Sequence, residues 1–457
     1  MLDSTTEIVR SAWGSLGGTA AETARVTIAG QGSLPSTFAV TDLACAAVAT
    51  AALSVADLAQ HLGSRSHVVT VDRRLASFWF RSSIRPIGWT VPPTWDALAG
   101  DYRTSDGWIR LHTNAPHHRR AAERVLGPRA NKDEMARAVA RWPKRDLETA
   151  IIDAGGCAAE MRATSVWSDH PQGRAVAAEP LIHMVARDRV PARNANAPAS
   201  RPLAGVRVLD LTRVLAGPVA SRFLAGYGAD VLRIDPPDWN EPGVVPEVTL
   251  GKRCARLDLK TAEGRAAFEA LLAQADIFLS GYRPGALDGL GYDAAARRAI
   301  APGLIDVSLC AYGWSGPWAG RRGFDSLVQM STGIAEAGMR WKSTDVPYPL
   351  PVQALDHTTG YLTAATAVRG FVHRLIGREG MEARLSLART AKLLVDLGTG
   401  RESASLAAES AADISPSIEK TDWGDARRLV PPAVIADVPM HWPRPAGNLG
   451  SAKPQWN

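Results

Sequence analysis

The chain has 457 residues, of which 46% are hydrophobic and 21% are charged, and its formal net charge is +6 at pH 7. This length predicts two or three domains, and the composition is typical of a soluble globular protein. The basic residues are scattered and form no block with interleaved aromatics, which disfavours nucleic acid as a partner. A mildly basic chain suits an anionic small ligand, such as a nucleotide or a CoA ester, and it suits a solvated surface without a specific role equally well.

The cysteines and the apolar segments indicate a cytoplasmic protein. The four cysteines are far apart and lack the spacing of a metal site or a disulfide frame, so we expect reduced thiols and no bound metal. The N-terminal segment is polar and lacks the apolar core of a secretory signal. The most apolar run begins at Leu43 and is flanked by Asp42 and Asp57, which predicts a buried helix and no membrane span.

Helices and short strands alternate in the first half of the chain. Asp42 opens a long helix, and a short β run with a further helix follows it. Alternating residues on either side of a turn at 105–107 predict a β-hairpin. Helical patterns follow at 117–126, 132–141 and 146–154, the last of them ending at a glycine pair.

A change in composition at 188–203 separates the two halves. This segment is rich in Pro, Ala, Asn and Arg without periodicity, which indicates a linker. Beyond it, apolar strands alternate with helices, which predicts βαβ units. The expected strands lie at 206–212, 229–237, 275–282 and 304–313. The predicted fold class is therefore α/β, with a doubly wound parallel sheet in a Rossmann-like large domain and a smaller α+β domain.

The loop Val214–Pro218 follows the first of these strands and opens a helix. Its backbone N–H groups are expected to point beyond the strand end, where a helix N-terminus favours a phosphate. The loop matches neither a dinucleotide fingerprint nor a P-loop, and a plain βα turn explains it equally well.

Basic and aromatic residues recur near the expected strand ends, as Lys252 with Arg253 and as Tyr282 with Arg283. Such groups suit the rings and phosphates of an adenine nucleotide, although a solvated surface explains any one of them. A long loop rich in Gly, Trp and Arg follows the fourth strand and leads to a helix near Phe324. Loops of this length are usually functional or mobile.

Asp356 stands before an Ala-rich helical run, and no partner residues of a known catalytic set stand beside it. Asp is among the best N-cap residues, so a capping role explains it. Asp42 opens a similar helix in the first half. The glycines near the two helix ends, Gly63 and Gly377, are 314 positions apart, as the two aspartates are. This echo suggests that the two halves carry copies of one element.

Five motifs stand in order in the second half of the chain. They are PLAGVRVLDLTRVLAGPVASRFLAGYGADVLRIDPP, GKRCARLDLKTAEGR, ADIFLSGYRPGALDGLGYD, GFDSLVQMSTG and DHTTG. Through them, residues 202–392 resemble the family III CoA-transferases, the group that includes formyl-CoA and carnitine-CoA transferases, and the related α-methylacyl-CoA racemases. Taken together and in this order, the motifs are highly specific.

The resemblance implies a chemistry for Asp356, which falls on the nucleophile of the family's D-x-x-x-G motif, with Gly360 as the glycine. In that family the carboxylate attacks an acyl-CoA thioester to give a mixed anhydride, and the returning thiolate gives an aspartyl-CoA thioester. The implied function is transfer of CoA from an acyl-CoA to a small carboxylic acid. CoA and acyl-CoA are then substrates, no cofactor is tightly bound, and the implied assembly is a homodimer.

The resemblance and the basic strand ends together predict residues that contact CoA. The family's loop after the first strand often has Gln in the middle, where this chain has Leu215. The family's Asn-Phe pair falls on Gly281 and Tyr282, and its basic residue after the second strand falls on Pro236. The predicted contacts are Val214, Leu215, Ala216, Lys252, Arg253, Tyr282, Arg283 and Tyr312.

Two alternatives stay open beside the transferase. The racemase branch moves an α-proton with a His–Asp pair, and its His falls on Phe324, which disfavours racemisation or isomerisation by that mechanism. His357, beside Asp356, is expected to be a surface residue. The second alternative is a catalytically inactive CoA-binding member of the family, since several contact positions differ from the family pattern.

The first half resembles the later half of the family, placed before its earlier half, as in a permuted or fused chain. Asp42 aligns with the nucleophile in this copy, but Ala46 stands where the motif has Gly, so we expect a structural relic. The predicted domains are a small-domain and C-terminal-half-like region at 1–187, a linker at 188–203, a CoA-binding large domain at 204–392, and a C-terminal tail at 393–457 that packs back on them.

Overall fold

The computed structural model describes residues 4–190, 197–400 and 404–456 of the chain. Within these residues the main sheet has seven strands in the order β10-β9-β8-β11-β12-β13-β7. Neighbouring strands are parallel except β13 and β7, which pair antiparallel at one edge. The strands are β7 (His183–Arg189), β8 (Arg207–Leu211), β9 (Asp230–Asp235), β10 (Lys252–Arg256), β11 (Ile277–Ser280), β12 (Ile305–Cys310) and β13 (Glu379–Ser386). Numbered from β8, the parallel strands have the order 3-2-1-4-5-6 of a doubly wound sheet.

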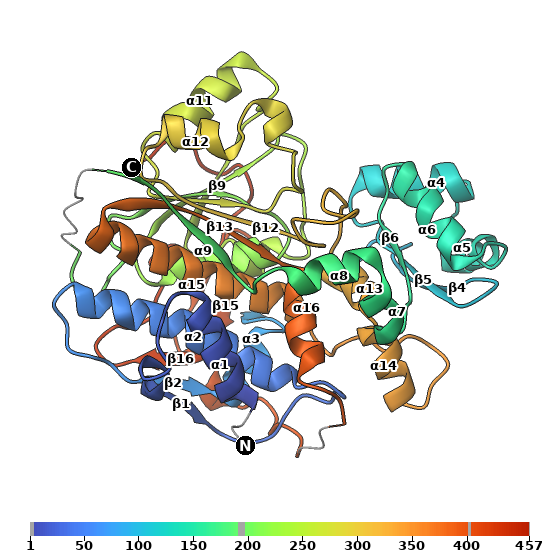
Figure 1. Ribbon diagram of the computed structural model, residues 1–457, viewed down its shortest axis with the longest axis horizontal. Helices are drawn as coiled ribbons and strands as arrows, with labels where there is room; N and C mark the ends of the chain where they lie inside the picture. Colours follow the sequence, from blue (N-terminus) through green and yellow to red (C-terminus); the bar gives the residue numbers. More distant parts are fainter. Residues whose placement is uncertain (1–3, 191–196, 401–403, 457) are drawn as a thin grey trace.

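Helices cover both faces of this sheet, as Figure 1 shows. One face carries α9 (Ala216–Gly226) and α15 (Ala354–Gly377), and the other carries α11 (Ala262–Leu272) and α12 (Ala294–Ile300). Val208 and Ile277 pack in the core of α9 and α15, whereas their neighbours Leu209 and Phe278 pack in the core of α11. Burial on both faces explains why the strands are apolar throughout, and it confirms the predicted doubly wound α/β class.

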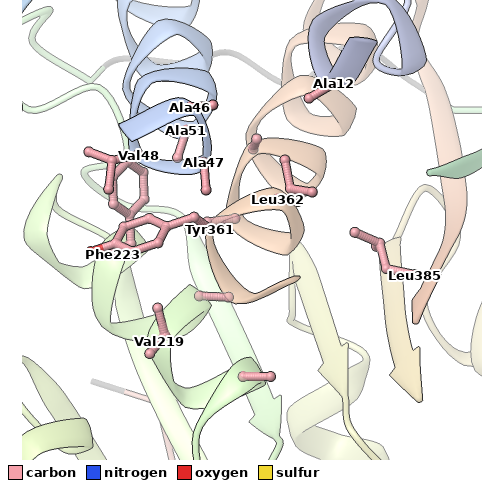
Figure 2. Close-up of a cluster of buried hydrophobic side chains, with 14 of the residues drawn as sticks. Ala12, Ala46, Ala47, Val48, Ala51, Val219, Phe223, Tyr361, Leu362 and Leu385 are labelled. Atoms are coloured by element: carbon pink, nitrogen blue, oxygen red, sulfur yellow. The ribbon is translucent and has the colours of Figure 1, made fainter. Parts of the chain in front are cut away.

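The N-terminal helices complete the core on the outer side of α15. They are α1 (Ser4–Ser15) and α2 (Val40–His61). Figure 2 shows Ala47 and Val48 of α2 in one apolar cluster with Phe223 of α9 and Tyr361 of α15. Among the described residues, α2 is the one helix long and apolar enough to cross a membrane, and 94% of its apolar window is buried inside the protein. It is the buried helix expected from the apolar run at Leu43.

One unit of the main sheet has a second copy in the N-terminal half. The N-terminal copy consists of β1 (Val26–Ala29), α2, β2 (Val69–Asp72) and α3 (Arg73–Trp79). Its counterpart consists of β12, α15, β13 and α16 (Leu387–Asp396). β1 and β2 are parallel, and α2 lies between them in the chain as α15 lies between β12 and β13. The side chains of Asp72 and Ser386 cap the helices that follow β2 and β13. These caps are 314 positions apart, as are Asp42 and Asp356, so the sequence echo is a repeated β-α-β-α unit.

A smaller α+β unit lies beside the main body (Figure 1). It consists of β4 (Gly100–Arg103), β5 (Trp108–Leu111), β6 (Ala158–Glu160), α4 (Pro116–Leu126), α5 (Lys132–Val139) and α6 (Lys144–Asp153). β4 and β5 form the hairpin predicted around 105–107, and the three helices confirm the helical patterns of this region. A separate hydrophobic cluster, which includes Leu98, Ile109 and Met135, holds the unit together.

Shorter elements connect these bodies. They are η1 (Glu22–Arg25), β3 (Ile84–Pro86), α7 (Thr164–Asp169), α8 (Pro171–Ala178), α10 (Val245–Val248), η2 (Asp288–Leu290), α13 (Asp325–Ser331), α14 (Ile334–Trp341), η3 (Ala411–Asp413), β14 (Glu419–Thr421), β15 (Gly424–Arg428) and β16 (Ala433–Ile435). Near the C-terminus, β15 pairs with β14 and β3, and β16 pairs with β2. All four cysteines are buried and free.

The predicted domain bounds stay a prediction. β7 begins before the predicted linker, includes its first two residues and belongs to the main sheet, because it pairs with β13. Residues 191–196 of the linker and 401–403 of the tail lie outside the described residues.

Glu247 of α10 ties three segments together in the interior. Its carboxylate accepts the backbone N–H of Ser83 at 3.0 Å and pairs with Arg428 of β15 at 3.2 Å, and it also pairs with Arg222 of α9. Although burial opposes ionisation, these arginines lower the pKa of Glu247 to about 2. The C-terminal strands are therefore held to the main body by a buried charge network.

Candidate active site

A cavity of about 380 Å³ opens at the carboxyl end of the main sheet. Its wall includes residues from the ends of β8, β11 and β12, from the first turns of α9 and α15, and from α4 of the smaller unit. In doubly wound sheets the ligand crevice lies at this edge, where the strand order reverses, here between β8 and β11. The charged and aromatic lining residues are His117, His118, Arg213, Trp239, Tyr282, Arg283, Arg321, Arg322, Phe324 and Asp356.

Asp356 is the one carboxylate among the described lining residues of this cavity. It lies in the first turn of α15 and is 8% exposed, and none of the described residues donates a hydrogen bond to its carboxyl group. Burial and the nearby carboxyl of Asp325 raise its pKa well above the usual 3.8. A carboxylate without donors and with little water is more basic, and hence a better nucleophile, than one at the surface.

Asp325, the first residue of α13, caps α15 from a distance. One of its carboxylate oxygens accepts the N–H groups of Leu355 at 2.9 Å and of Asp356 at 3.0 Å, and the other accepts a hydrogen bond from Gln329. Burial raises the pKa of Asp325 to about 6. The capping role expected for Asp356 therefore belongs to Asp325. This residue is distant in the sequence and reaches the first turn of α15 only through the tertiary fold. These two amides are engaged by Asp325 and are not free to stabilise an oxyanion.

Five of the predicted CoA contacts line the cavity. They are Val214, Leu215, Ala216, Tyr282 and Arg283. Val214 has a φ of 65°, in the left-handed region that a β-branched residue rarely adopts, and its N–H donates to Glu241 at 2.9 Å. Strained backbone of this kind is concentrated at ligand sites, although the Val214 N–H is engaged by Glu241 and does not itself point to a phosphate.

Lys252 and Arg253 do not reach the cavity. They begin β10, so they lie at the amino end of a parallel strand, away from the ligand edge. Lys252 is buried with its ammonium group 3.3 Å from Asp210, and Arg253 pairs with Asp230 at 2.8 Å. The three basic residues of this strand are typical of a solvated surface, and the strand itself was not expected from its sequence.

Tyr312 and His357 also differ from expectation. Tyr312 does not line the cavity, since its side chain is fully buried and its hydroxyl lies 3.1 Å from that of Ser331. His357 is not a surface residue, because it is 1% exposed and stacks on Phe80 with ring centroids 4.9 Å apart. On a helix buried on all sides, the residue after Asp356 faces the interior as well.

Positive charge without a protein counterion surrounds the cavity. Within the described part of the chain, no carboxylate forms an ion pair with Arg213, Arg283 or Arg322. The guanidinium of Arg213 lies over the rings of Trp239 at 4.7 Å and Tyr282 at 4.5 Å, which fixes its position. This arrangement suits an anionic ligand with several negative groups. No group of three or more potential metal ligands occurs in the residues that the structure describes.

Several cavity residues were not singled out as site residues from the sequence. Arg321 and Arg322 belong to the Gly-, Trp- and Arg-rich loop, whose length and composition did signal a function. Arg213 directly follows the first expected strand, so its position was a usable signal. His117 and His118 come from the other half of the chain and carried no local signal.

Comparisons with known proteins found similarity in the part of the chain that carries most of this cavity. Residues 203–410 match the family model described as CoA-transferase family III. This part of the chain, called the family III region below, contains Asp356 and the five predicted contacts that line the cavity. His117 and His118 lie outside it.

Curated relatives resemble the same part of the chain. The acetyl-coenzyme A transferase nodX of Hypoxylon pulicicidum is 34% identical over 186 residues, which cover 39% of this chain and 31% of that protein. The probable fatty acyl-CoA transferase Rv3272 of Mycobacterium tuberculosis is 33% identical over 195 residues, which cover 38% and 48%. A crystal structure of Rv3272 aligns with a TM-score of 0.39 at 30% identity and covers 43% of this chain and 56% of that one. The chain thus spans about half or less of the length of these relatives.

Proposed function

We propose that this protein transfers CoA from an acyl-CoA thioester to a small carboxylic acid, with Asp356 as the nucleophile. The observation that carries the proposal is a buried carboxylate to which no described residue donates a hydrogen bond. It lies inside the family III region, in a cavity also lined by Arg213, Arg283 and Arg322, which have no carboxylate partner among the described residues. CoA is then a substrate, and its phosphates would meet Arg213 and Arg283 at the carboxyl edge of the sheet. The homodimer and the cytoplasmic location stay predictions.

The proposed exchange proceeds through covalent intermediates on Asp356. Its carboxylate oxygen attacks the thioester carbonyl, the C–S bond breaks, and a mixed anhydride and the CoA thiolate form. The thiolate then attacks the aspartyl carbonyl, which releases the donor acid and leaves an aspartyl-CoA thioester. The acceptor carboxylate attacks this thioester, the C–S bond breaks, and a second mixed anhydride and the CoA thiolate form. The thiolate finally attacks the acceptor's carbonyl in this anhydride, which gives the acceptor's CoA thioester and regenerates the Asp356 carboxylate. Each step exchanges one activated acyl bond for another.

The surroundings of Asp356 support this role. Burial holds the carboxylate in a high-energy state, whereas a surface carboxylate is stabilised by water and reacts poorly. Asp325 accepts two backbone hydrogen bonds from the first turn of α15 and so fixes the position of the Asp356 backbone. The Asp356 carboxylate is then held in place without a hydrogen bond from any described residue.

Mass spectrometry tests the proposal directly. The protein is incubated with a panel of acyl-CoA thioesters, quenched, digested and searched for a CoA adduct on the Asp356 peptide, with Asp356→Asn as the near-isosteric variant. Asp42→Asn is the matched control, because Asp42 occupies the equivalent position in the second copy. We expect the adduct in the wild type and in Asp42→Asn, and its loss in Asp356→Asn.

Other outcomes assign the alternatives. Loss of α-deuterium from the acyl group without acyl exchange would identify a racemase or isomerase. Tight binding of acyl-CoA without adduct, exchange or deuterium loss would identify an inactive CoA-binding protein. Either result would overturn the transferase proposal.

A further inference from the structure

His118 brings an unsatisfied polar side chain from the first half of the chain to the cavity of Asp356. It lies in the first turn of α4, before the family III region, and it lines the same cavity as Asp356. Its side chain is 4% exposed. Neither of its ring nitrogens has a hydrogen-bond partner among the residues that the structure describes.

Aromatic rings surround His118. The ring centroid of His117 lies 4.1 Å away, that of Phe324 lies 5.8 Å away, and that of His112 lies 6.4 Å away. These contacts hold the imidazole in place without satisfying its polar atoms. Burying a polar group without a partner is unfavourable, so such a group calls for an explanation, and a ligand that completes its hydrogen bonds provides one.

The imidazole of His118 is uncharged near neutral pH. Burial, His117 and Arg322 lower its pKa to about 3. A neutral imidazole offers one N–H donor and one acceptor nitrogen. It can therefore bind a hydroxyl, oxo or carboxylate oxygen, whereas an alkyl chain leaves both nitrogens unpaired.

We propose that His118 is a specificity-determining residue that hydrogen-bonds to a polar oxygen on the acyl group or on the acceptor acid. This inference rests on the proposed CoA transfer and names its substrate class, which is short acyl groups that carry a hydroxyl, oxo or carboxylate group. A short acyl group fits the cavity of about 380 Å³, which also has to admit the thiol end of CoA. The proposed partners of the CoA phosphates are the arginines at the sheet edge, so His118 is assigned to the acyl group or the acceptor acid.

Matched thioesters test this role. Butanoyl-CoA, 3-hydroxybutanoyl-CoA and succinyl-CoA have four-carbon acyl groups and differ in polar oxygens. For each, kcat/KM of CoA transfer and the yield of the Asp356 adduct are measured in the wild type, His118→Phe and His118→Asn. The Phe variant keeps the ring and its packing, and the Asn variant keeps a donor and an acceptor. His183→Phe is the control, since His183 is exposed at the start of β7 and does not line this cavity.

We expect the wild type and His183→Phe to prefer at least one polar thioester over butanoyl-CoA by about 10-fold or more, as one buried hydrogen bond allows. In His118→Phe the ratio of kcat/KM for that polar thioester to kcat/KM for butanoyl-CoA should fall to about one. His118→Asn should keep part of the preference. The ratio is internally normalised, so a general loss of folded protein does not change it.

The outcomes separate this inference from the function on which it rests. Adduct formation with an unchanged ratio in His118→Phe would overturn the inference and leave the transferase proposal intact. An equal fall for all three thioesters would show a structural role and would also overturn it. Absence of any adduct in the wild type would overturn the proposed function, and the inference with it.

Discussion

Asp325 makes the stability of the protein depend on pH in a way that can be calculated. Its carboxylate is 1% exposed and accepts two backbone hydrogen bonds and one from Gln329. Its pKa in the folded protein is about 6, against the usual 3.8. The folded protein therefore binds this proton more tightly than the unfolded chain does. The stability that the group contributes is fully present below about pH 3.8 and is lost as the pH rises through about 6.

The size of the effect follows from the two pKa values. A rise from 3.8 to about 6 corresponds to about 3 kcal/mol, at about 1.4 kcal/mol for each pH unit. In Asp325→Asn the side chain stays neutral, so this pH-dependent loss disappears. The amide oxygen can still accept the N–H groups of Leu355 and Asp356, but the amide nitrogen faces the donor of Gln329. That mismatch costs about 1–3 kcal/mol at every pH.

Urea unfolding of the wild type and of Asp325→Asn, at about pH 4 and about pH 8, measures the prediction. We expect the variant to be less stable at the lower pH by about 1–3 kcal/mol. Its free energy of unfolding relative to the wild type should then rise by about 2.5 kcal/mol towards the higher pH, since the unfolded carboxyl is already partly ionised at about pH 4. A difference that stays constant within about 1 kcal/mol between these pH values would refute the reasoning. Asp356→Asn removes the neighbouring carboxyl, whose pKa is also raised. Its free energy of unfolding relative to the wild type should therefore also be higher at the higher pH than at the lower.

Three further substitutions test other parts of the structure. Glu247→Gln should lower the free energy of unfolding by about 3 kcal/mol at pH 7, because buried arginines lose their counterion, and the difference should shrink as the pH falls from 4.5 towards about 2 in a urea titration. Gly360→Ala places a Cβ atom 2.4 Å from the carbonyl oxygen of Ala216, so it should cost about 2 kcal/mol in urea unfolding and lower the adduct yield. Asp42→Asn breaks the ion pair with Arg73 at 2.6 Å, so it should cost about 1 kcal/mol in thermal unfolding and leave the CoA adduct unchanged.

Each of these substitutions has a contradicting outcome. Unfolding free energies for Glu247→Gln that equal those of the wild type at pH 7 would mean that the buried network does not hold the C-terminal strands. A fully stable Gly360→Ala would contradict the close contact between α15 and the first turn of α9. Loss of the adduct in Asp42→Asn would contradict the structural role assigned to the second copy.

Local patterns predicted the elements whose signals lie within a few residues. The hairpin of β4 and β5 follows from alternation around one turn, and the strands β8, β9, β11 and β12 follow from apolar runs between helices. β10 was missed because three of the five residues of Lys252–Arg256 are basic, a composition typical of a solvated surface and not of a buried strand. Burial of these charges depends on partners elsewhere, such as Asp210 and Asp230.

The sequence by itself determined the fold class, the family resemblance of the second half, and Asp356 as the residue of chemical interest, because strand–helix alternation and ordered motifs are properties of the chain. Tertiary structure alone decided which charges face the ligand. It placed Arg213 and Arg322 at the cavity and turned Lys252 and Arg253 away, since only the pairing of strands fixes which end lies at the ligand edge. It also brought His118 from the other half of the chain to the cavity of Asp356, where neither residue alone signals a shared site.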